Sequence, residues 1–472
     1  MKILLTGATG YIGKRLLPIL VAQGHDIICC VRDKNRFYIP IELTAKIDVI
    51  EVDFLKEETL NNIPYDIDAA YYLIHSMSSS ADNYDELEQI SAENFVAKIN
   101  TTNAKQVIYL SGIVNDESLS KHLSSRKNVE NILSSGTFAL TTLRAGIIVG
   151  SGSASFEIIR DLVNKLPVMI TPKWLNTKCQ PIAINDVLDF LSKSLLNPIT
   201  YNQSFDIGGP DILTYKEMLL AFAKAKKLRR WIFTVPVMTP KLSSYWLYFV
   251  TSTSYKLASA LVSSMKVEVI CRDTKINELL QVTPMSYEQA LSRALIKVDE
   301  DKVASSWKDS LVSGRFKSNI SEYLQVPKKD CFIDRRKMEI INRDFTIHQI
   351  WSIGGETGWY YGDWLWGLRG FIDKLYGGVG SRRGRTNKHD IHAGDALDFW
   401  RVLYANKEEG KLILFAEMKL PGEAWLEFKI IGNTLYQSAT FRPRGIWGKL
   451  YWYSVLPFHG FIFKGMLTKL IK

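Results

Sequence analysis

The chain begins at residues 1–20 with MKILLTGATGYIGKRLLPIL, in which Gly7, Gly10 and Gly13 recur at a spacing of three. The short run KILLT before the first glycine is typical of a buried parallel strand. Apolar side chains at helical spacing follow until Gly24, and HDIICCVR then forms a second apolar run. The pattern predicts a strand, a glycine-rich turn, a helix and a second strand within about 30 residues, which indicates a dinucleotide-binding unit.

The three glycines have separate physical roles in such a turn. Gly7 permits a tight turn, Gly10 lets the backbone approach a pyrophosphate, and Gly13 lets the helix pack close to the strand. The N-terminus of the helix then supplies a favourable dipole for the phosphates. We expect the cofactor to contact this loop, at Thr6, Gly7, Gly10, Tyr11, Ile12 and Gly13. The alternative is a glycine-rich turn that binds no ligand.

The end of the second strand carries the signal for the type of nucleotide. An acidic residue there would bind a ribose 2′-hydroxyl, whereas a cation would bind a 2′-phosphate. The sequence places Arg32 at this point, with Lys34 or Arg36 able to assist it, but Asp33 is a competing acidic residue. We predict NADP as the cofactor, with NAD as the alternative.

The GxxGxxG spacing with its lead-in TGATG resembles the short-chain dehydrogenase/reductase superfamily, in its extended and atypical NmrA-like branches. The resemblance covers about residues 1–325 and implies an α/β Rossmann domain with a parallel sheet and a small cap. It also implies that Asp53 and Phe54 contact the adenine, and that Leu73 and Ile74 lie beside the ribose and the nicotinamide.

The same resemblance implies a catalytic serine at Ser111, at the end of the strand QVIYLSGI, and a ribose-binding lysine at Lys127. In the superfamily, a tyrosine four residues before this lysine gives a proton to the substrate oxygen. Leu123 stands there instead, and none of the 21 tyrosines has a lysine four residues further on. The proton would therefore have to come through Ser111, His75 or His122. The alternative roles are a structural histidine bonded to the backbone for His75 and a plain surface lysine for Lys127.

Two segments, at about residues 151–180 and 228–300, are expected to form the cap over the cofactor cleft. Their aromatic side chains could line an apolar pocket or pack in the core. These side chains are Trp231, Phe233, Tyr245, Trp246, Tyr248 and Phe249. Between the two segments, CQPIAINDVLDFLSKSL predicts a helix capped by Asn185 and Asp186.

The sequence changes character near residues 325–330, where helical patterns give way to aromatic residues and alternating strands. Four antiparallel strands are predicted, at DALDFWRVLYA, KLILFAEMKL, AWLEFKIIG and NTLYQSATFRP, with a hairpin turn at Leu420–Glu423. The second of these strands should bury one face, formed by Leu412, Leu414, Ala416 and Met418. An aromatic helix is expected to close the chain.

This arrangement at residues 331–472 resembles the α+β helix-grip fold of START-like (SRPBCC) domains. The stretch WYYGDWLWGLRGFIDKLYGGVGSRRGR is similar to a domain of unknown function that is fused behind atypical short-chain dehydrogenases in bacteria. Helix-grip domains hold an apolar ligand between sheet and helix, so the resemblance implies such a ligand here. Eight tryptophans could line that space or simply fill the core; they are Trp351, Trp359, Trp364, Trp366, Trp400, Trp425, Trp447 and Trp452.

The formal net charge is +10, and residues 331–472 contain 21 Lys and Arg against 14 Asp and Glu. This balance suits an acidic partner, a membrane surface or nucleic acid, or an ordinary solvated basic face. We predict no nucleic-acid binding. The residues at the end of the chain are expected to close the helix-grip, and peripheral membrane contact is their alternative role. They are Phe461, Phe463, Lys464, Leu467, Lys469 and Lys472.

Five cysteines without a CxxC pattern argue against a disulfide framework and indicate a reducing, cytoplasmic compartment. We predict no signal peptide and no membrane span, because the longest apolar stretch, Tyr245–Met265, is interrupted by polar residues. His389 and His392 have no evident third ligand, so no metal is expected. The basic stretch GGVGSRRGR at 377–385 lacks the ending of a phosphate loop and is expected to be a solvated loop.

Together these features predict an NAD(P)H-binding protein similar to atypical short-chain dehydrogenases, acting as an oxidoreductase on an apolar carbonyl or quinone-like compound. That small apolar molecule would bind in the cap cleft or in the second domain. The alternative is a non-catalytic NADP(H) sensor or assembly protein whose second domain binds a lipid or a protein. The sequence leaves the substrate and the oligomeric state open.

Overall fold

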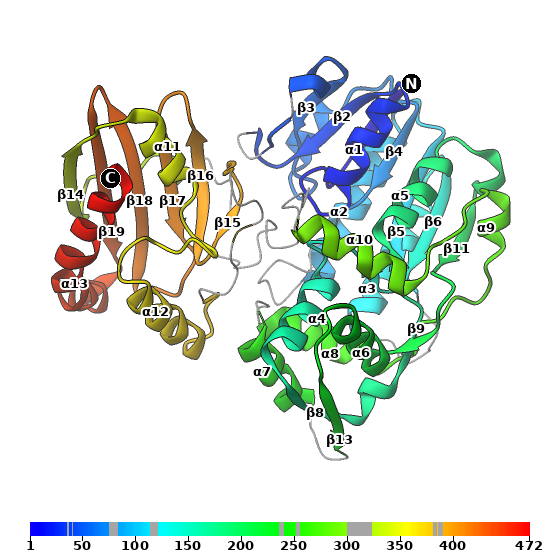
Figure 1. Ribbon diagram of the computed structural model, residues 1–472. Helices are drawn as coiled ribbons and strands as arrows, with labels where there is room; N and C mark the ends of the chain where they lie inside the picture. The colour runs from blue at the N-terminus through cyan, green and yellow to red at the C-terminus, as the bar shows by residue number, and fades with distance from the viewer. Residues whose placement is uncertain are drawn as a thin grey trace. The chain divides into compact units, whose positions relative to one another are not determined.

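The computed structural model describes residues 1–34, 37–39, 41–74, 84–113, 121–235, 240–251, 255–299, 323–380, 385 and 390–472 (Figure 1). The chain forms two compact units. The first comprises Met1–Lys34 with Ile39–Val312, and the second comprises Asn35–Tyr38 with Ser313–Lys472.

The first unit is built on a seven-stranded sheet with the order β11-β6-β5-β4-β1-β2-β3, in which all neighbours are parallel. Its strands are β1 (Lys2–Leu5), β2 (Asp26–Val31), β3 (Ile47–Glu51), β4 (Ala69–Tyr72), β5 (Gln106–Gly112), β6 (Ala139–Ala145) and β11 (Gln203–Ile207). The strand order reverses at β1, which is flanked by β2 and β4, and ligands of such sheets bind at this reversal. The predicted α/β Rossmann fold is confirmed.

Helices cover both faces of this sheet, as the buried runs of its strands require. The helices α1 (Gly13–Ala22) and α5 (Ile184–Lys193) lie on one face, and α2 (Tyr84–Ile99) and α3 (Lys121–Leu133) lie on the other (Figure 1). Neighbouring tyrosines of β4 show the alternation. The hydroxyl of Tyr71 donates to the carbonyl of Leu191 in α5 at 3.0 Å, whereas the ring of Tyr72 packs edge-on to Phe95 of α2 at 4.8 Å.

A second hydrophobic core lies in the remainder of the first unit. Its helices are α4 (Ala154–Lys165), α6 (Tyr215–Ala225), α7 (Pro240–Val250), α8 (Tyr255–Ser264), α9 (Lys275–Leu279) and α10 (Tyr287–Asp299). Its short strands are β7 (Ile148–Val149), β8 (Val168–Pro172), β9 (Lys178–Cys179), β10 (Ile182–Ala183), β12 (Leu213–Thr214) and β13 (Trp231–Val235). Phe156 of α4 and Phe222 of α6 meet at 5.7 Å in this core, so α6 belongs to it in addition to the two segments predicted for the cap.

The aromatic side chains expected in the cap have different environments. Tyr248 is buried and Trp246 packs partly against the core, whereas Trp231, Phe233 and Tyr245 are exposed. The interpretation that these three side chains pack in the core is therefore wrong. The side chain of Phe249 lies outside the described part of the structure.

The predicted cap of α5 is also wrong. Ala183 is the N-cap residue and makes no side-chain cap, while Asn185 and Asp186 lie inside the first turn. The buried Asp186 carboxylate instead accepts a hydrogen bond from the backbone N–H of Met285 at 2.9 Å, which ties α5 to the segment before α10. Burial raises the pKa of Asp186 to about 6, although the Met285 hydrogen bond acts in the opposite direction.

The second unit contains a six-stranded antiparallel sheet with the order β14-β19-β18-β17-β16-β15. Its strands are β14 (Phe332–Glu339), β15 (Ala396–Leu397), β16 (Trp400–Asn406), β17 (Lys411–Ala416), β18 (Gly422–Ile431) and β19 (Thr434–Pro443), and its helices are α11 (Arg343–Trp351), α12 (Asp363–Leu375) and α13 (Gly445–Ile471). The four predicted strands, the hairpin between β17 and β18 and the closing helix are confirmed. The fold is thus an antiparallel sheet with helices.

Strand β17 is buried on both faces rather than on one. Leu412 and Leu414 face the main core of the unit, as expected, but Ile413 and Phe415 on the opposite face are buried as well. Phe415 packs against Trp425 at 5.3 Å and against Tyr323 at 4.9 Å. The segment that precedes β14 therefore covers part of the outer face, which the alternation of a single strand does not reveal.

Most of the tryptophans of this unit pack against other aromatic rings. Trp359 meets Trp366 at 5.2 Å and is stacked with Phe399 at 6.3 Å in the main core. That core also contains Trp351 and Trp400, while Trp452 stacks on Phe332 and Phe441 at another place. Trp364 and Trp447 are 70% and 77% exposed, so these two side chains neither pack in the core nor line an interior space.

Replacing Asp186 by Asn should change how stability depends on pH. A carboxyl whose pKa is raised to about 6 in the folded state binds more protons than the unfolded chain between about pH 4 and pH 6, so its contribution falls as the pH rises through that window. Asn keeps an acceptor for Met285 and removes the buried charge. We expect D186N to gain stability relative to the unsubstituted protein as the pH rises from 4 to 6.

Urea unfolding at several pH values measures this effect. The exposed Glu278 on α9 provides a control, since E278Q should follow the unsubstituted protein. A D186N variant with an unchanged pH profile would contradict the assignment of a raised pKa.

Candidate functional site

The glycine loop between β1 and α1 has no room for side chains at two of its positions. Gly7 has a φ of +66°, and a Cβ atom there would lie 2.5 Å from the carbonyl oxygen of Leu73. A Cβ atom on Gly13 would lie 2.3 Å from the carbonyl oxygen of Gly7. The N–H of Gly10 donates to that same carbonyl at 2.9 Å and closes the turn. Only glycine fits at positions 7 and 13, because the helix begins directly against the loop.

The N-terminus of α1 is open to an anion. Ile12 is the N-cap residue and provides no side-chain cap, and the first turn has no acidic residue. The N–H groups of Lys14 and Leu16 are bonded to carbonyls of Gly10 and Ile12, but within the described part of the chain no acceptor meets the N–H of Ile12 or Gly13. Unsatisfied N–H groups and the helix dipole together make such a terminus favourable for phosphate.

Thr6 joins the two strands at the reversal of the sheet. Its hydroxyl donates to the carbonyl of Tyr71 at 2.9 Å and accepts from the N–H of Leu73 at 3.0 Å. Thr6 is fully buried, so its side chain fixes the end of β4 beside the loop. Leu73 and Ile74 follow as half-buried residues. His75 lies outside the described residues.

The end of β2 presents cations to solvent and buries its acidic residue. Arg32 and Lys34 are exposed, whereas Asp33 is only 4% exposed. Arg36 lies outside the described residues. At the next strand, the Asp53 carboxylate accepts from the N–H of Leu55 at 3.2 Å, which holds the turn after β3.

Phe54 follows Asp53 and is part of the sheet core, so its ring packs inward. Its carbonyl accepts a hydrogen bond from the side-chain amide of Asn94 at 2.8 Å, which ties this turn to α2.

Ser111 lies at the end of β5, on the edge of the sheet to which the glycine loop also belongs. It is only 3% exposed. Tyr109, two residues earlier on the same face of the strand, donates from its hydroxyl to the carbonyl of Arg126 at 3.4 Å. Burial raises the pKa of Tyr109, while the charge of Arg126 and a hydrogen bond with Ser111 act to lower it. Ser111 thus has a buried tyrosine as its neighbour.

Tyr109 and Arg126 were missed by sequence reasoning, which searched for a tyrosine on the helix. The signal for Tyr109 was its position two residues before Ser111, which places both side chains on one face of a strand. Arg126 of α3 also donates to the carbonyl of Leu110 at 3.3 Å. Lys127 is exposed on α3, and no ion pair joins it to a described residue.

The side chains of His122 and Leu123 lie outside the described part of the structure. The predicted proton relay through His122 is therefore neither supported nor contradicted by contacts in this structure.

A row of charged side chains crosses the strands next to Ser111. Ser111 is in register with Arg144 of β6, which is in register with Asp206 of β11. Arg144 donates to the Glu130 carboxylate of α3 at 2.6 and 3.1 Å, and Arg272 donates to Asp206 at 2.8 Å with two of its nitrogens. These paired charges fix α3 and the loop at Arg272 against the sheet.

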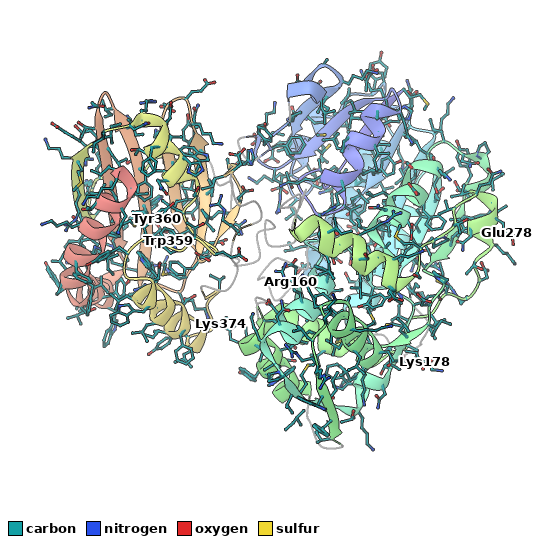
Figure 2. The ribbon with its side chains drawn as sticks, viewed as in Figure 1. Arg160, Lys178, Glu278, Trp359, Tyr360 and Lys374 are labelled. Carbon is teal, nitrogen blue, oxygen red and sulfur yellow. The ribbon has the colours of Figure 1, made fainter. Side chains whose placement is uncertain are left out.

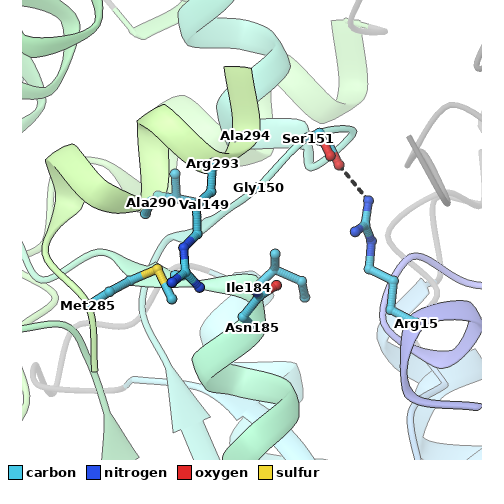
Figure 3. A pocket seen from close by; sticks show the side chains of 11 residues that line it. Arg15, Val149, Gly150, Ser151, Ile184, Asn185, Met285, Ala290, Arg293 and Ala294 are labelled. Carbon is cyan, nitrogen blue, oxygen red and sulfur yellow. Dashed lines mark hydrogen bonds between the residues drawn. The ribbon is translucent and has the colours of Figure 1, made fainter. Parts of the chain in front are cut away.

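The first helix is also tied to the cap region. The Arg15 guanidinium donates to the carbonyl of Ser151 at 2.7 Å and lies 4.7 Å from the centre of the Tyr11 ring (Figure 3). Arg15 borders a small pocket of about 20 Å³, which is enough for a water molecule. Burial raises the pKa of Tyr11 to about 12. The Tyr11 side chain is thus a packing element between the loop and Gly150, where a Cβ atom would come within 2.7 Å of its hydroxyl.

No metal site emerges from the part of the chain that the structure describes, because no three His, Cys, Asp or Glu side chains are grouped to hold an ion. Of the two histidines considered as ligands, His392 lies 3.4 Å from Asp390, and His389 is outside the described residues. Residues 381–384 of the basic stretch are outside them as well.

Comparison with protein families assigns a separate match to each unit. Residues 7–150 match a family described as NAD(P)H-binding, and residues 328–466 match DUF2867, a family described as a protein of unknown function. The first unit is therefore a Rossmann domain whose residues 7–150 match an NAD(P)H-binding family, and this match supports a nicotinamide cofactor. The comparison does not support a START-like assignment for the second unit.

Curated relatives match part of the first unit. The chain is 24% identical over 227 residues to the chloroplastic divinyl chlorophyllide a 8-vinyl-reductase of Arabidopsis thaliana, covering 44% of this chain and 54% of that protein. It is 24% identical over 213 residues to the photosystem II assembly factor Ycf39 of Trieres chinensis, covering 44% of this chain and 64% of that protein. The chain spans little more than half the length of these relatives.

Solved structures support the fold of the first unit. A nucleoside-diphosphate-sugar epimerase from Staphylococcus aureus aligns with a TM-score of 0.50 and 17% identity, over 62% of this chain and 99% of that one. At this identity the likeness concerns the fold alone.

Replacing Gly13 by Ala should destabilise the first unit more than replacing Gly10. The new methyl group at position 13 would overlap the Gly7 carbonyl, whereas at position 10 it would lie 3.1 Å from the same oxygen, a close but tolerable contact. We expect G13A to cost about 1–3 kcal/mol or more, and G10A less than about 1 kcal/mol. Thermal unfolding followed by circular dichroism measures both. Equal melting temperatures for the two variants would contradict the packing described for α1.

Proposed function

We propose that the protein is an NADP(H)-dependent oxidoreductase that acts on an apolar carbonyl or quinone-like compound. The observation that carries this proposal is the glycine loop, where Gly7 and Gly13 exclude side chains and the N-terminus of α1 is uncapped. This loop lies on the same sheet edge as Ser111, two strands away across β4. A dinucleotide bound at the loop would extend along that edge toward Ser111.

Backbone groups of the loop would bind the pyrophosphate. Gly7, Gly10 and Gly13 keep the surface free of side chains, and the N–H groups of Ile12 and Gly13 are available as donors. The fully buried side chain of Thr6 would support the loop. Tyr11, which is partly exposed, would lie between the loop and Gly150 and could still touch the cofactor. The loop therefore fits a diphosphate through its backbone.

The adenosine half would lie over the ends of β2 and β3. Arg32 and Lys34 would bind a 2′-phosphate, and burial of Asp33 removes the competing acid from the exposed surface. These observations favour NADP over NAD. The turn at Asp53 and Phe54 would contact the adenine, and Leu73 and Ile74 would contact the ribose and the nicotinamide.

When bound, the nicotinamide supplies hydride chemistry, and the protein supplies binding and proton control. We propose that the Ser111 hydroxyl donates a hydrogen bond to the substrate oxygen and delivers the proton that this oxygen gains. Tyr109 would position Ser111, because burial keeps its own pKa raised and its phenol protonated at neutral pH. Lys127, exposed on α3, would bind the ribose hydroxyls. The role of His75 as a proton relay stays a prediction.

The second unit would bind the apolar substrate or a partner, as the resemblance to helix-grip domains suggested. Its core between sheet and helices is occupied by packed rings such as Trp359, Trp366 and Phe399. An interior ligand would require these rings to move. This favours a supporting or docking role for the unit over a role as a ligand cage.

A non-catalytic function as a sensor of NADP(H) or as an assembly protein is the second candidate. Leu123 at the position of the usual tyrosine favours it, and so does the similarity to an assembly factor beside the similarity to a reductase. The two candidates differ in one observable, which is whether bound cofactor is consumed.

Replacing Arg32 by Ala should weaken NADPH binding at least tenfold and leave NADH binding nearly unchanged, because the guanidinium would meet only the 2′-phosphate. Isothermal titration calorimetry with both nucleotides measures the two dissociation constants. Arg229, an exposed arginine between α6 and β13, provides the matched control, since R229A removes the same charge elsewhere. Equal losses for NADPH and NADH in R32A would argue against the 2′-phosphate contact.

Replacing Ser111 by Ala should lower turnover about 10²–10⁴-fold while the dissociation constant for NADPH stays the same, because the hydroxyl would act on the substrate rather than on the cofactor. NADPH oxidation with a panel of quinones and ketones measures turnover. Tight NADPH binding without oxidation of any substrate would favour the sensor or assembly function.

A further inference from the structure

The second unit exposes a long stripe of large apolar side chains on α12. The stripe follows helical spacing, with side chains between 45% and 70% exposed, and consists of Trp364, Leu368, Phe371, Ile372 and Leu375. The opposite side of the helix is buried, at Gly370, Asp373 and Lys374. Trp366 of the same helix packs inward against Trp359 and Phe399. The helix therefore presents apolar side chains outward as well as toward the core, unlike a helix whose outer face is polar.

Helix α13 is apolar on all sides. Trp452, Phe463 and Met466 are buried against the sheet. On the opposite side, with exposures between 51% and 77%, lie Ile446, Trp447, Leu450, Tyr453, Phe458 and Phe461. A helix that is hydrophobic all round is normally enclosed on every side or placed in a lipid environment.

The end of α13 fits the closing role expected for it better than the alternative of membrane contact. Phe463 and Leu467 are buried in the core, whereas Phe461 is exposed. Those two side chains close the core of the unit, and the exposed surface lies mainly on the N-terminal half of the helix.

The two stripes form one surface because the helices lie side by side. The rings of Tyr361, just before α12, and Phe461 of α13 meet at 4.9 Å. Further along, the guanidinium of Arg369 lies 5.1 Å from the centre of the Tyr451 ring. Figure 1 shows α12 and α13 together on one side of the unit, and Figure 2 shows their side chains projecting outward. We name the eleven exposed side chains of the two stripes the aromatic face.

The charges on the α13 part of the aromatic face are positive, while α12 contributes the exposed Asp363 beside Trp364. Residues 445–472 contain four lysines and no Asp or Glu, and Arg444 is exposed directly before α13. Lys449 and Lys464 are exposed on the helix itself. A second copy of the chain on this face would bring like charges together, whereas an anionic surface would be attracted.

We propose that the aromatic face docks on the surface of a bilayer that contains anionic phospholipids. Helices α12 and α13 would lie in the plane of the interface, with the aromatic rings and Leu and Ile side chains among the upper acyl chains and the lysines at the headgroups. Trp and Tyr prefer this depth because each ring joins a large apolar body to one polar group. None of the helices that the structure describes meets the length and hydropathy needed to cross a bilayer, so the contact is peripheral. This inference does not depend on the proposed enzymatic function.

Vesicle flotation with the full chain tests the proposal. The unsubstituted protein should float with phosphatidylcholine vesicles that contain 30% phosphatidylglycerol and should bind at least several-fold more weakly to pure phosphatidylcholine. The double variant W447S/L450S should bind the anionic vesicles at least tenfold more weakly. The control is the double variant I341S/I431S, which alters exposed apolar residues of the same unit that lie outside α12 and α13 and should bind normally.

A second pair of substitutions separates the contributions of charge and apolar contact. K449E/K464E leaves all apolar side chains in place and should remove the preference for anionic lipid. Circular dichroism and NADPH titration of each variant check that the fold and the cofactor site are unchanged, so a failure here is distinct from a failure of the proposed function.

Three results would overturn the proposal. One is the absence of binding to vesicles of either composition, and another is equal binding by W447S/L450S and the control. The third is concentration-dependent dimerisation in light scattering that W447S/L450S abolishes without any vesicle binding, which would identify a second copy as the occupant of the aromatic face.

Discussion

The contact between the start of α1 and the carbonyl of Gly7 governs the architecture of the first unit. A Cβ atom at Gly13 would approach that oxygen to 2.3 Å, so the helix can begin this close to the strand only because the side chain is absent. The same carbonyl accepts the N–H of Gly10, and Gly7 itself lies against Leu73 of the neighbouring segment. The Gly7 carbonyl thus sets the turn and the start of the helix, and the Leu73 carbonyl limits how close Gly7 lies to the end of β4. The helix terminus is uncapped because its N-cap residue, Ile12, has no polar side chain.

A few polar contacts hold the parts of the site in register with this loop. Thr6 connects β1 to the end of β4, and Arg15 reaches from the first helix to Ser151 in the cap region. Farther along the sheet edge, Ser111 has Tyr109 and Arg126 as neighbours instead of a tyrosine on the helix. A phenol whose pKa is raised by burial stays neutral, so it can orient a serine but is a poor proton donor.

The sheets of the two units are covered in different ways. In the first, helices enclose both faces, and almost every residue of the central strands β1, β2 and β4 is buried. In the second, packed aromatic rings fill the space between the sheet and α13, while α12 and α13 direct further apolar side chains outward. The excess of aromatic residues in this part of the sequence therefore serves two purposes, which composition does not distinguish. The positively charged residues within 445–472 lie on α13, which also exposes apolar side chains. The surface is therefore both apolar and positively charged.

The sequence alone determined the features that depend on local pattern. Glycine spacing predicted the loop, apolar runs predicted β1, α1 and β2, and alternation predicted β16 to β19. The aromatic stretch at the end of the sequence predicted the closing helix. Only the tertiary structure decided which face each side chain occupies. It placed Asp186 against Met285 instead of at a helix cap, buried Asp33 while exposing Arg32, and set Tyr109 beside Ser111. It also turned Trp447 outward and Trp452 inward on one helix. Burial depends on what packs against a residue from distant parts of the chain. A helix that is apolar on every side carries no local signal for which side is covered.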